Sequence, residues 1–229
     1  MSKIKYLFSR GFPIALLNEE IEFPVINNVF GDLVAIGGDL CPERLIAAYK
    51  NGIFPWYIDD DNLPHWFCPK MRMVLEPKSF KKSRSLSKAI RSNRYEISCD
   101  RDFETIMRNC AKPRKDEGES WISEEFIINY SKLHEIGIAH SIEARLNGEI
   151  VGGLYGLQIG RIFFGESMFA FAADASKIAL AFLCETQPFG EIDFIDCQVA
   201  SDHLRSLGAI DIKRESFLTQ LAKSIPLSF

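Results

Sequence analysis

Three consecutive runs, which either alternate apolar and polar residues or are wholly apolar, constrain the fold of this chain more than any other feature. They occupy residues 140–146, 150–158 and 161–169. The dipeptide Asn147-Gly148 separates the first two runs and favours a two-residue β-hairpin turn. Ile159-Gly160 turns the chain again, so the three runs predict an antiparallel meander. The next segment, 176–185, is apolar nearly all round, which predicts a buried helix.

The elements expected on either side complete a mixed sheet. Downstream, the pattern predicts a strand at 194–199, a short helix ending at Gly208, a strand at 210–213 and a helix at 217–224. Upstream, it predicts strands at 74–75 and 95–98 and helices at 84–92 and 103–110, and a longer helix that Ser123 caps and Gly137 ends. From residue 140 the order is β-β-β-α-β-α-β. It predicts the α/β (α+β) class, with helices on the faces of the sheet.

Residues 1–71 are rich in Gly and Pro and show one convincing helix. Pro42 stands in its first turn, Glu43 favours the positive end of its dipole, and Gly52 stops it. This part is too small and irregular for an extensive core of its own. We therefore expect a small N-terminal α+β domain over 1–71 and a larger domain over 72–229.

Composition excludes several classes of protein. The apolar runs are far shorter than the ~20 residues that a membrane-spanning helix needs, and residues 1–10 lack the apolar stretch of a signal peptide. The six cysteines are scattered, without a CxxC pair or a His-x3-His partner, so neither a metal site nor a disulfide framework is expected. We expect a cytoplasmic protein without membrane contact, and a monomer by default.

A net charge of -4 argues against an indiscriminate nucleic-acid binder, but one segment departs from this average. Residues 78–94 contain seven Lys and Arg residues and no acid. On a helix, Arg84, Lys88 and Arg91 share one face. A solvated helix face usually mixes charges of both signs, so a phosphate-binding surface is favoured over a plain solvated face.

Two acids stand within apolar runs that read as strands, Glu166 in 164–169 and Asp196 in 194–199. A carboxylate among apolar residues is costly to bury unless another group pairs with it. The alternative is that both acids lie on the solvent face of their strands or cap turns. Cys197, beside Asp196, lacks an obvious base in the sequence, so we do not assign it as a nucleophile.

The order of elements resembles the catalytic half of the GNAT-like N-acyltransferases, in which an acyl donor and an amine meet between splayed central strands. These enzymes hold coenzyme A with a Gly-rich pyrophosphate loop before the helix that follows the third long strand. Here that place reads AADASK, at 172–177, and Asp174 would repel a pyrophosphate. The donor is therefore expected to be something other than acetyl coenzyme A.

Several ordered segments together resemble one family, the leucyl/phenylalanyl-tRNA–protein transferases. Three places depart from the family pattern, at 67–69, at Ala170 and in the acidic loop 59–61. These departures put peripheral contacts in doubt and leave the central motifs intact. The matching segments are AIGGDL at 35–40, PERL at 42–45, NGIFPW at 51–56, SRSL at 83–86, WI at 121–122, LHE at 133–135, AHS at 139–141, VGGLYG at 151–156, GESMF at 165–169, ASK at 175–177 and IDCQ at 195–198.

The resemblance implies an enzyme that moves Leu or Phe, and also Met, from its tRNA onto the N-terminal Arg or Lys of a protein. The new peptide bond marks that protein for degradation under the N-end rule. The aminoacyl ester is already activated, so no metal or other cofactor is implied. The attacking amine must lose a proton, and the resemblance assigns this step to Asp196 with Gln198. It leaves open whether Asp196 is a base or only orients the amine, with the tRNA hydroxyl as the proton relay.

Further roles follow from the same resemblance. Glu166, with Ser167, would bind the cationic end of the acceptor, and Arg84, Lys88 and Arg91 would bind tRNA phosphates. Aromatic rings provide stacking surfaces for the terminal adenine, and their alternative is a place in the core, which suits Trp56, in a Pro-containing loop, less than Tyr49. Apolar residues provide a pocket for the donor side chain, and each of these is equally readable as core. This aminoacyl-adenosine set is Tyr49, Trp56, Trp121, Leu154, Phe163, Leu180, Leu183 and Ile195. The competing interpretations are a coenzyme A-dependent acetyltransferase and an RNA-binding module without chemistry.

Overall fold

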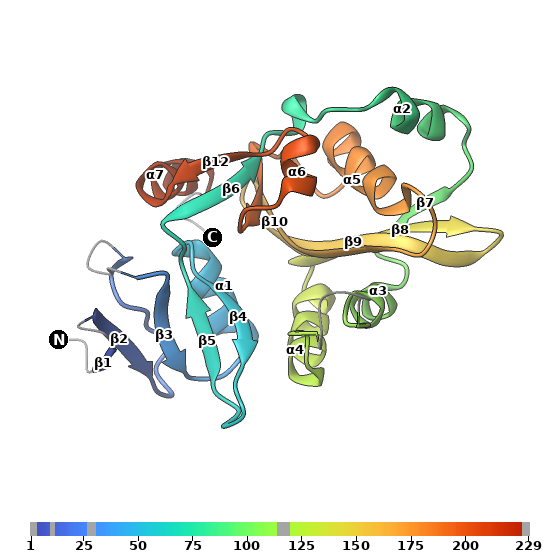
Figure 1. Cartoon of the computed structure of the whole chain (residues 1–229). Helices are drawn as coiled ribbons and strands as arrows, with labels where there is room; N and C mark the ends of the chain where they lie inside the picture. The colour runs from blue at the N-terminus through green and yellow to red at the C-terminus, as the bar shows by residue number, and fades with distance from the viewer. Residues whose placement is uncertain (1–3, 10–11, 27–30, 114–119, 226–229) are drawn as a thin grey trace.

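The computed structural model describes residues 4–9, 12–26, 31–113 and 120–225, and its strands form two sheets (Figure 1). The smaller sheet belongs to the N-terminal part and has the strand order β1-β2-β3-β5-β4. Its helix, α1 (Pro42–Lys50), packs against β4 and begins with the expected proline. The strands are β1 (Lys5–Ser9), β2 (Phe12–Leu17), β3 (Leu33–Gly37), β4 (Phe54–Ile58) and β5 (Pro64–Phe67).

The larger sheet contains the predicted meander. Its order is β12-β6-β11-β10-β9-β8-β7, in which β8, β9 and β10 are antiparallel neighbours and β10 and β11 run parallel. The mixed sheet of the expected α/β class is thereby confirmed. Its strands are β6 (Met71–Leu75), β7 (Glu96–Cys99), β8 (Ala139–Leu146), β9 (Glu149–Ile159), β10 (Ile162–Ala170), β11 (Phe194–Gln198) and β12 (Ile210–Lys213).

Helices cover both faces of the larger sheet (Figure 1). In that view α5 lies above β8, β9 and β10, with α2 on its outer side, and α3 and α4 lie below the sheet. Most of α5 is buried, as its uniformly apolar sequence predicts. The helices after α1 are α2 (Arg84–Arg91), α3 (Phe103–Cys110), α4 (Glu124–Glu135), α5 (Ala175–Thr186), α6 (Asp202–Ser206) and α7 (Arg214–Ser224), with a 3₁₀ turn at Pro77–Ser79.

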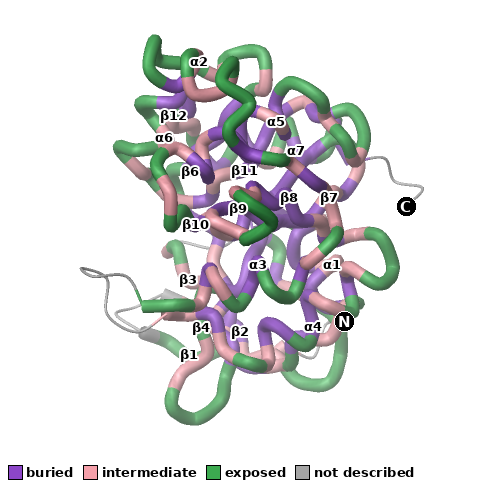
Figure 2. Tube along the Cα trace, turned by 90° about the vertical axis from the view of Figure 1, so that its right-hand side faces the viewer, coloured by how far each residue is buried: buried purple, intermediate pink, exposed green. Residues whose placement is uncertain are grey.

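The two sheets share a buried core. One apolar cluster joins Trp66 and Tyr49 of the N-terminal part to Tyr130 of α4 and Tyr155 of β9. A second cluster fills the space between α5 and the opposite face of the larger sheet. Figure 2 shows buried stretches in both halves of the molecule and mostly exposed residues along α2. None of the described helices combines the length and apolar character that crossing a membrane requires.

Candidate active site

The central strands of the larger sheet separate where the sequence places its two buried acids. β10 and β11 are paired as far as Phe164 and Asp196 and no further. Beyond that pair, β10 follows β9 through a β-bulge at Glu166, and β11 follows β6 through a bulge at Cys197. Bulges disrupt the ladder and re-aim side chains. The wedge between the strands therefore carries Glu166 on one side and Gln198 on the other.

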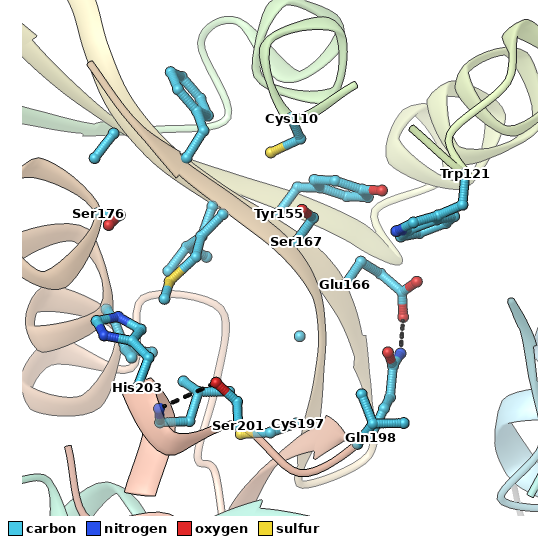
Figure 3. Close-up of a pocket in the computed structure, with 18 of the residues that line it drawn as sticks. Cys110, Trp121, Tyr155, Glu166, Ser167, Ser176, Cys197, Gln198, Ser201 and His203 are labelled. Carbon is cyan, nitrogen blue, oxygen red and sulfur yellow. Dashed lines mark hydrogen bonds between the residues drawn. The ribbon is translucent and has the colours of Figure 1, made fainter. Parts of the chain in front are cut away.

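A cavity of about 1300 Å³ opens in this wedge (Figure 3). Its volume exceeds the roughly 300–1,000 Å³ of most small-molecule pockets, so two substrates have room to meet in it. Trp121, Tyr155 and Gln198 surround the Glu166 end, whereas Ser176 and His203 lie at the opposite end (Figure 3). Of the residues proposed from the sequence, Trp56, Trp121, Leu154, Phe163, Glu166, Ser167, Leu180, Leu183, Ile195 and Gln198 line the cavity.

Glu166 supplies the carboxylate of the cavity wall among the described residues, and its side chain is only 8% exposed. Oε1 accepts hydrogen bonds from the Tyr49 hydroxyl and from Gln198 Nε2, each at 2.7 Å. Oε2 accepts a longer one, 3.3 Å, from the Tyr130 hydroxyl. Because Gln198 turns its amide nitrogen toward this carboxylate, its amide oxygen is left for a different donor.

Burial raises the pKa of the Glu166 carboxyl to about 7. The hydrogen bonds from Tyr49, Gln198 and Tyr130 favour the ionised form and oppose that rise, while the charge of Asp196 adds to it. Burial and then the charge of Glu166 hold the pKa of the Tyr49 and Tyr130 hydroxyls well above its usual range, so both remain donors. A carboxyl with a pKa near neutrality is suited to taking up and releasing a proton.

Asp196 has a partner that the sequence analysis missed, the guanidinium of Arg72 on β6. Both side chains are fully buried. Arg72 Nε donates to Oδ1 at 2.8 Å and Nη2 donates to Oδ2 at 2.6 Å. Burial lowers the pKa of Arg72, but the charge and the hydrogen bonds of Asp196, with smaller contributions from Cys68 and Tyr49, together hold that pKa above its ordinary value. Asp196 does not line the cavity. Its carboxylate is thus paired with Arg72, a contact that the sequence analysis did not foresee.

Arg72 is itself fixed on every side. Its guanidinium carbon lies 4.7 Å from the ring centroid of Phe54 on β4 and 4.5 Å from that of Phe217 on α7. Nη1 donates to the carbonyl oxygen of Gly52 at 3.2 Å. Planar stacking and several donors are what suit arginine to a buried ion pair.

Tyr49 also has a position different from the one expected for an adenine-stacking ring. The residue is fully buried and does not line the cavity. Its ring packs beside that of Phe164, with centroids 5.0 Å apart, and its hydroxyl lies 2.6 Å from the Tyr130 hydroxyl. A ring covered on both faces has no surface for a base. In this structure Tyr49 supports Glu166 from α1.

The two tryptophans differ from Tyr49 because both reach the cavity. Trp56 is 37% exposed and packs edge-on against Phe67 at 5.0 Å. Trp121 is partly exposed and meets the ring of Phe126 edge-on at 5.2 Å. Each ring is held by a neighbour while part of its surface stays open, the geometry that a stacking platform needs.

Tyr155 is a cavity residue that the sequence analysis did not single out. Its side chain is fully buried, and its hydroxyl has no hydrogen-bond partner among the described residues. The charge of Glu166, after burial, raises the pKa of this hydroxyl well above its usual range, so it is a neutral donor. A buried polar group without a partner is costly, and here it faces the space where substrates would lie (Figure 3).

The apolar end of the cavity lies toward α5. The residues expected to form the donor pocket are all at most 5% exposed and belong to the cluster beneath α5. Met168, on β10, adds a flexible side chain to the same wall. The donor-pocket residues brought together there are Leu154, Phe163, Leu180, Leu183 and Ile195.

The basic helix forms as expected, with the Ser83 side chain accepting from the Leu86 backbone N–H at its start. Arg84, Lys88 and Arg91 are exposed on its surface and form no ion pair with the part of the chain that the structure describes. α2 lies on the outer side of α5 (Figure 1).

Two further expectations concern Asp174 and Cys197. Asp174 begins α5 in a left-handed backbone conformation (φ 62°) and pairs with Lys177 at 2.9 Å. A carboxylate there is unsuited to a pyrophosphate. Burial and then the charge of Asp196 raise the pKa of the Cys197 thiol far above its ordinary value, which keeps it from acting as a thiolate.

Comparisons with known proteins agree with this geometry. A family model described as leucyl/phenylalanyl-tRNA protein transferase matches residues 74–222, and a model of the N-terminal domain of the same family matches residues 38–70. In the solved structure of FemX, the fold is similar at a TM-score of 0.51 with 11% identity, over 79% of this chain and 71% of that one. This likeness concerns the fold alone, and it accords with the GNAT-like arrangement expected from the sequence.

Curated relatives extend over almost the whole chain. The leucyl/phenylalanyl-tRNA–protein transferase of Nitrosospira multiformis is 47% identical over 215 residues, which cover 93% of this chain and 92% of the relative. The protein of the same name from Thermodesulfovibrio yellowstonii is 48% identical over 212 residues, covering 92% and 86%. The chain is a member of the leucyl/phenylalanyl-tRNA–protein transferase family.

Proposed function

We propose that this protein transfers Leu, Phe or Met from an aminoacyl-tRNA to the N-terminal Arg or Lys of an acceptor protein, forming a peptide bond. The observation that carries the proposal is the cavity in the wedge between β10 and β11, where an apolar wall stands opposite a hydrogen-bonded carboxylate. The names of the relatives supply the two amino acids, the tRNA and the protein acceptor. The acid and the apolar wall correspond to the two substrates that such a reaction joins.

The donor side chain enters the apolar end, between β9, β10 and α5. Leu154, Leu180 and Leu183 offer it walls without polar atoms. One methylene in such a pocket changes binding by only about 1–3 kcal/mol. The site is therefore expected to accept unbranched and γ-branched apolar side chains alike, which covers Leu, Phe and Met.

The terminal adenosine of the donor stacks on Trp56 and Trp121. Stacking of one base on an aromatic side chain contributes about 1–3 kcal/mol. The acceptor-stem phosphates meet Arg84, Lys88 and Arg91 on α2, whose cationic groups have no ion-pair partner in the described parts of the chain. A surface of this kind contributes affinity for tRNA without recognising its nucleotide sequence.

The acceptor approaches from the Glu166 end. A carboxylate is the natural partner of a cationic N-terminus, and Ser167, beside it on the cavity wall, adds a hydroxyl. The Tyr155 hydroxyl donates to a polar group of the bound substrates. Protein acceptors of this kind would be marked for N-end-rule degradation in the cytoplasm, and we expect the enzyme to act as a monomer.

The chemistry needs an amine without its proton and a positioned ester, so no metal or other cofactor is proposed. Asp196 Oδ1 accepts the backbone N–H of Gln198 at 2.9 Å. This bond supports the left-handed backbone of Gln198, at φ 62°. Gln198 then presents its amide oxygen to the attacking amine, which is how Asp196 and Gln198 act as a pair on β11.

A transfer assay with three arms tests the proposal. Labelled Leu-tRNA, free labelled Leu and acetyl coenzyme A are each incubated with the protein and a peptide that begins with Arg. We expect label in the peptide from Leu-tRNA alone, and none when the peptide begins with an acetylated residue. Acetylation of the peptide would instead identify a coenzyme A enzyme. Binding of tRNA without any transfer would identify an RNA-binding module.

A further inference from the structure

We propose that Glu166 takes the proton of the attacking α-amine, and that Arg72 and Asp196 are positioning residues, a permanent ion pair that fixes the groups in contact with that amine. The inference rests on the proposed function and assigns the proton transfer within the same site. It concerns which of the two buried carboxylates faces the substrate.

Asp196 accepts three hydrogen bonds from other groups of this chain. Oδ1 receives Arg72 Nε and the backbone N–H of Gln198, and Oδ2 receives Arg72 Nη2. Protonating this carboxylate would leave a fully buried guanidinium without its counter-ion, which costs several kcal/mol in proteins. Asp196 also lies behind the cavity wall rather than in it. Asp196 therefore lacks the access to substrate that a proton acceptor needs.

Glu166 meets the requirements that Asp196 does not. It lines the cavity, and from the residues that the structure describes Oε2 accepts one hydrogen bond, a long one from Tyr130 at 3.3 Å. The groups that face it are the hydroxyls of Tyr49 on α1, Tyr130 on α4 and Tyr155 on β9, and the Gln198 amide on β11. All four are neutral donors. The charged groups nearby are Asp196 and, paired with it, Arg72.

This environment gives the carboxyl a pKa of about 7, chiefly through burial. A general base works best with a pKa near the working pH, because it is then both ionised and basic enough to hold a proton.

The proton that leaves the amine is returned to the tRNA within the same site. The lone pair of the neutral α-amine attacks the ester carbonyl carbon, and a C–N bond forms as the carbonyl π electrons move to oxygen. Glu166 takes a proton from the nitrogen. When the tetrahedral intermediate collapses, the bond to the ribose oxygen of the tRNA breaks, and the proton passes from Glu166 to that oxygen. The products are a peptide bond and a free tRNA hydroxyl, with Glu166 ionised again.

The ion pair acts on this step through Gln198. Arg72 fixes Asp196, Asp196 holds the backbone N–H of Gln198, and the Gln198 side chain donates to Glu166 at 2.7 Å. The rings of Phe54 and Phe217 keep the guanidinium in place. A chain of fixed contacts thus runs from β6 through β11 to the carboxylate on β10.

The pH dependence of kcat/KM for an Arg-peptide, measured from pH 5 to 9 with an aminoacyl-adenosine donor, tests the assignment. In wild-type enzyme, both Glu166 and the acceptor amine, whose pKa is about 7.7–8.0, must be unprotonated. The acid limb should therefore approach a slope of two. Glu166→Gln should have a slope of one and a plateau lower by about 10²–10⁴-fold, the range typical of a lost general base. Glu149→Gln, an exposed acid on the same sheet, is the matched control.

Asp196 variants should keep the ionisation that Glu166→Gln loses. Asp196→Asn removes a negative charge that raises the pKa of Glu166, so the slope of two should persist while the lower ionisation moves to more acidic pH. Arg72→Met/Asp196→Asn leaves no unpaired guanidinium and should fold, with a lowered plateau and both ionisations retained. The proposal is overturned if Glu166→Gln keeps a slope of two, or if the double variant loses an ionisation. Failure of wild-type enzyme to transfer at all would reject the proposed function instead.

Discussion

Glu166 and Asp196 are both buried, yet their surroundings differ in charge. Asp196 faces a guanidinium at 2.6 Å, so its ionised form is compensated. Glu166 faces hydroxyl and amide donors without a cation, and its pKa rises to about 7. The ionised form of Glu166 is therefore a cost to the folded state, which native proteins commonly accept at functional sites.

The first prediction concerns that cost. The folded-state pKa of Glu166, about 7, lies above its ordinary value of 4.5, so stability falls as pH rises between the two values and stays low above pH 7. Glu166→Gln should remove this loss, which is on the order of 3 kcal/mol. In urea unfolding, the free energy of unfolding of the variant should increase relative to that of the wild type between pH 4.5 and pH 8. An equal difference in unfolding free energy at both pH values would contradict the assignment.

The second prediction uses the unpartnered hydroxyl of Tyr155. Because this hydroxyl has no acceptor or donor among the described residues, Tyr155→Phe should leave the free energy of unfolding unchanged or slightly higher. Transfer should nevertheless fall, by about tenfold for each 1.4 kcal/mol of lost hydrogen bonding to substrate. Tyr130→Phe is the control, since its hydroxyl bonds Tyr49 and Glu166 and its loss should lower stability. Full activity of Tyr155→Phe would remove this hydroxyl from the site.

At the scale of elements, α5 forms one wall of the donor pocket with Leu180 and Leu183. Leu183→Phe should fill part of the pocket and shift the preference away from Phe-tRNA toward donors with smaller side chains. Overpacking also strains a core, by about 1–3 kcal/mol. Ala181→Leu overpacks the same helix at a buried residue outside the cavity wall, so it should destabilise without changing donor preference. A native Leu-to-Phe ratio in Leu183→Phe would exclude Leu183 from the pocket.

The helix α2 is expected to act on the tRNA body alone. Replacing Arg84 and Lys88 with Ala should raise KM for aminoacyl-tRNA. It should also reduce the slope of log Kd against log salt concentration by about two, one for each phosphate contact. Turnover with aminoacyl-adenosine should stay nearly unchanged, because that donor has no acceptor stem. Lys223→Ala, an exposed lysine on α7, should affect neither donor. Equal losses of activity with both donors would mean that α2 is needed for folding and not for tRNA binding.

The elements also show which parts of the structure follow from sequence. The meander and α5 were predictable because their periodicity is strong and Asn147-Gly148 favours a single turn type. The strands of the smaller sheet were not, since each has only four to six residues and several contain Pro or Gly. The Arg72 partner of Asp196 was missed as well. Its signal was an arginine within the apolar strand Met71–Leu75, but no local rule connects it to a residue so distant in sequence.

At the scale of the whole molecule, the site belongs to both sheets. Arg72 of the larger sheet is packed between Phe54 of the smaller sheet and Phe217 of the last helix. From α1, Tyr49 reaches across to Glu166 on β10. The carboxylate thus lies on the larger sheet, and a hydroxyl from the helix of the N-terminal part affects its pKa. This explains why a ring expected to stack on adenine is buried between the two parts instead.

The last prediction tests this coupling. The hydrogen bond from Tyr49 lowers the pKa of Glu166 against the larger effect of burial, so Tyr49→Phe should raise that pKa above its value of about 7. Since transfer requires ionised Glu166, the acid limb of the kcat/KM profile should move to higher pH, with a larger loss at pH 6 than at pH 9. Tyr57→Phe, in an exposed ring of the smaller sheet stacked on His65, should leave the profile in place. If Tyr49→Phe lowers the plateau without moving the acid limb, α1 only supports the fold and does not set the ionisation of the carboxylate that meets the amine.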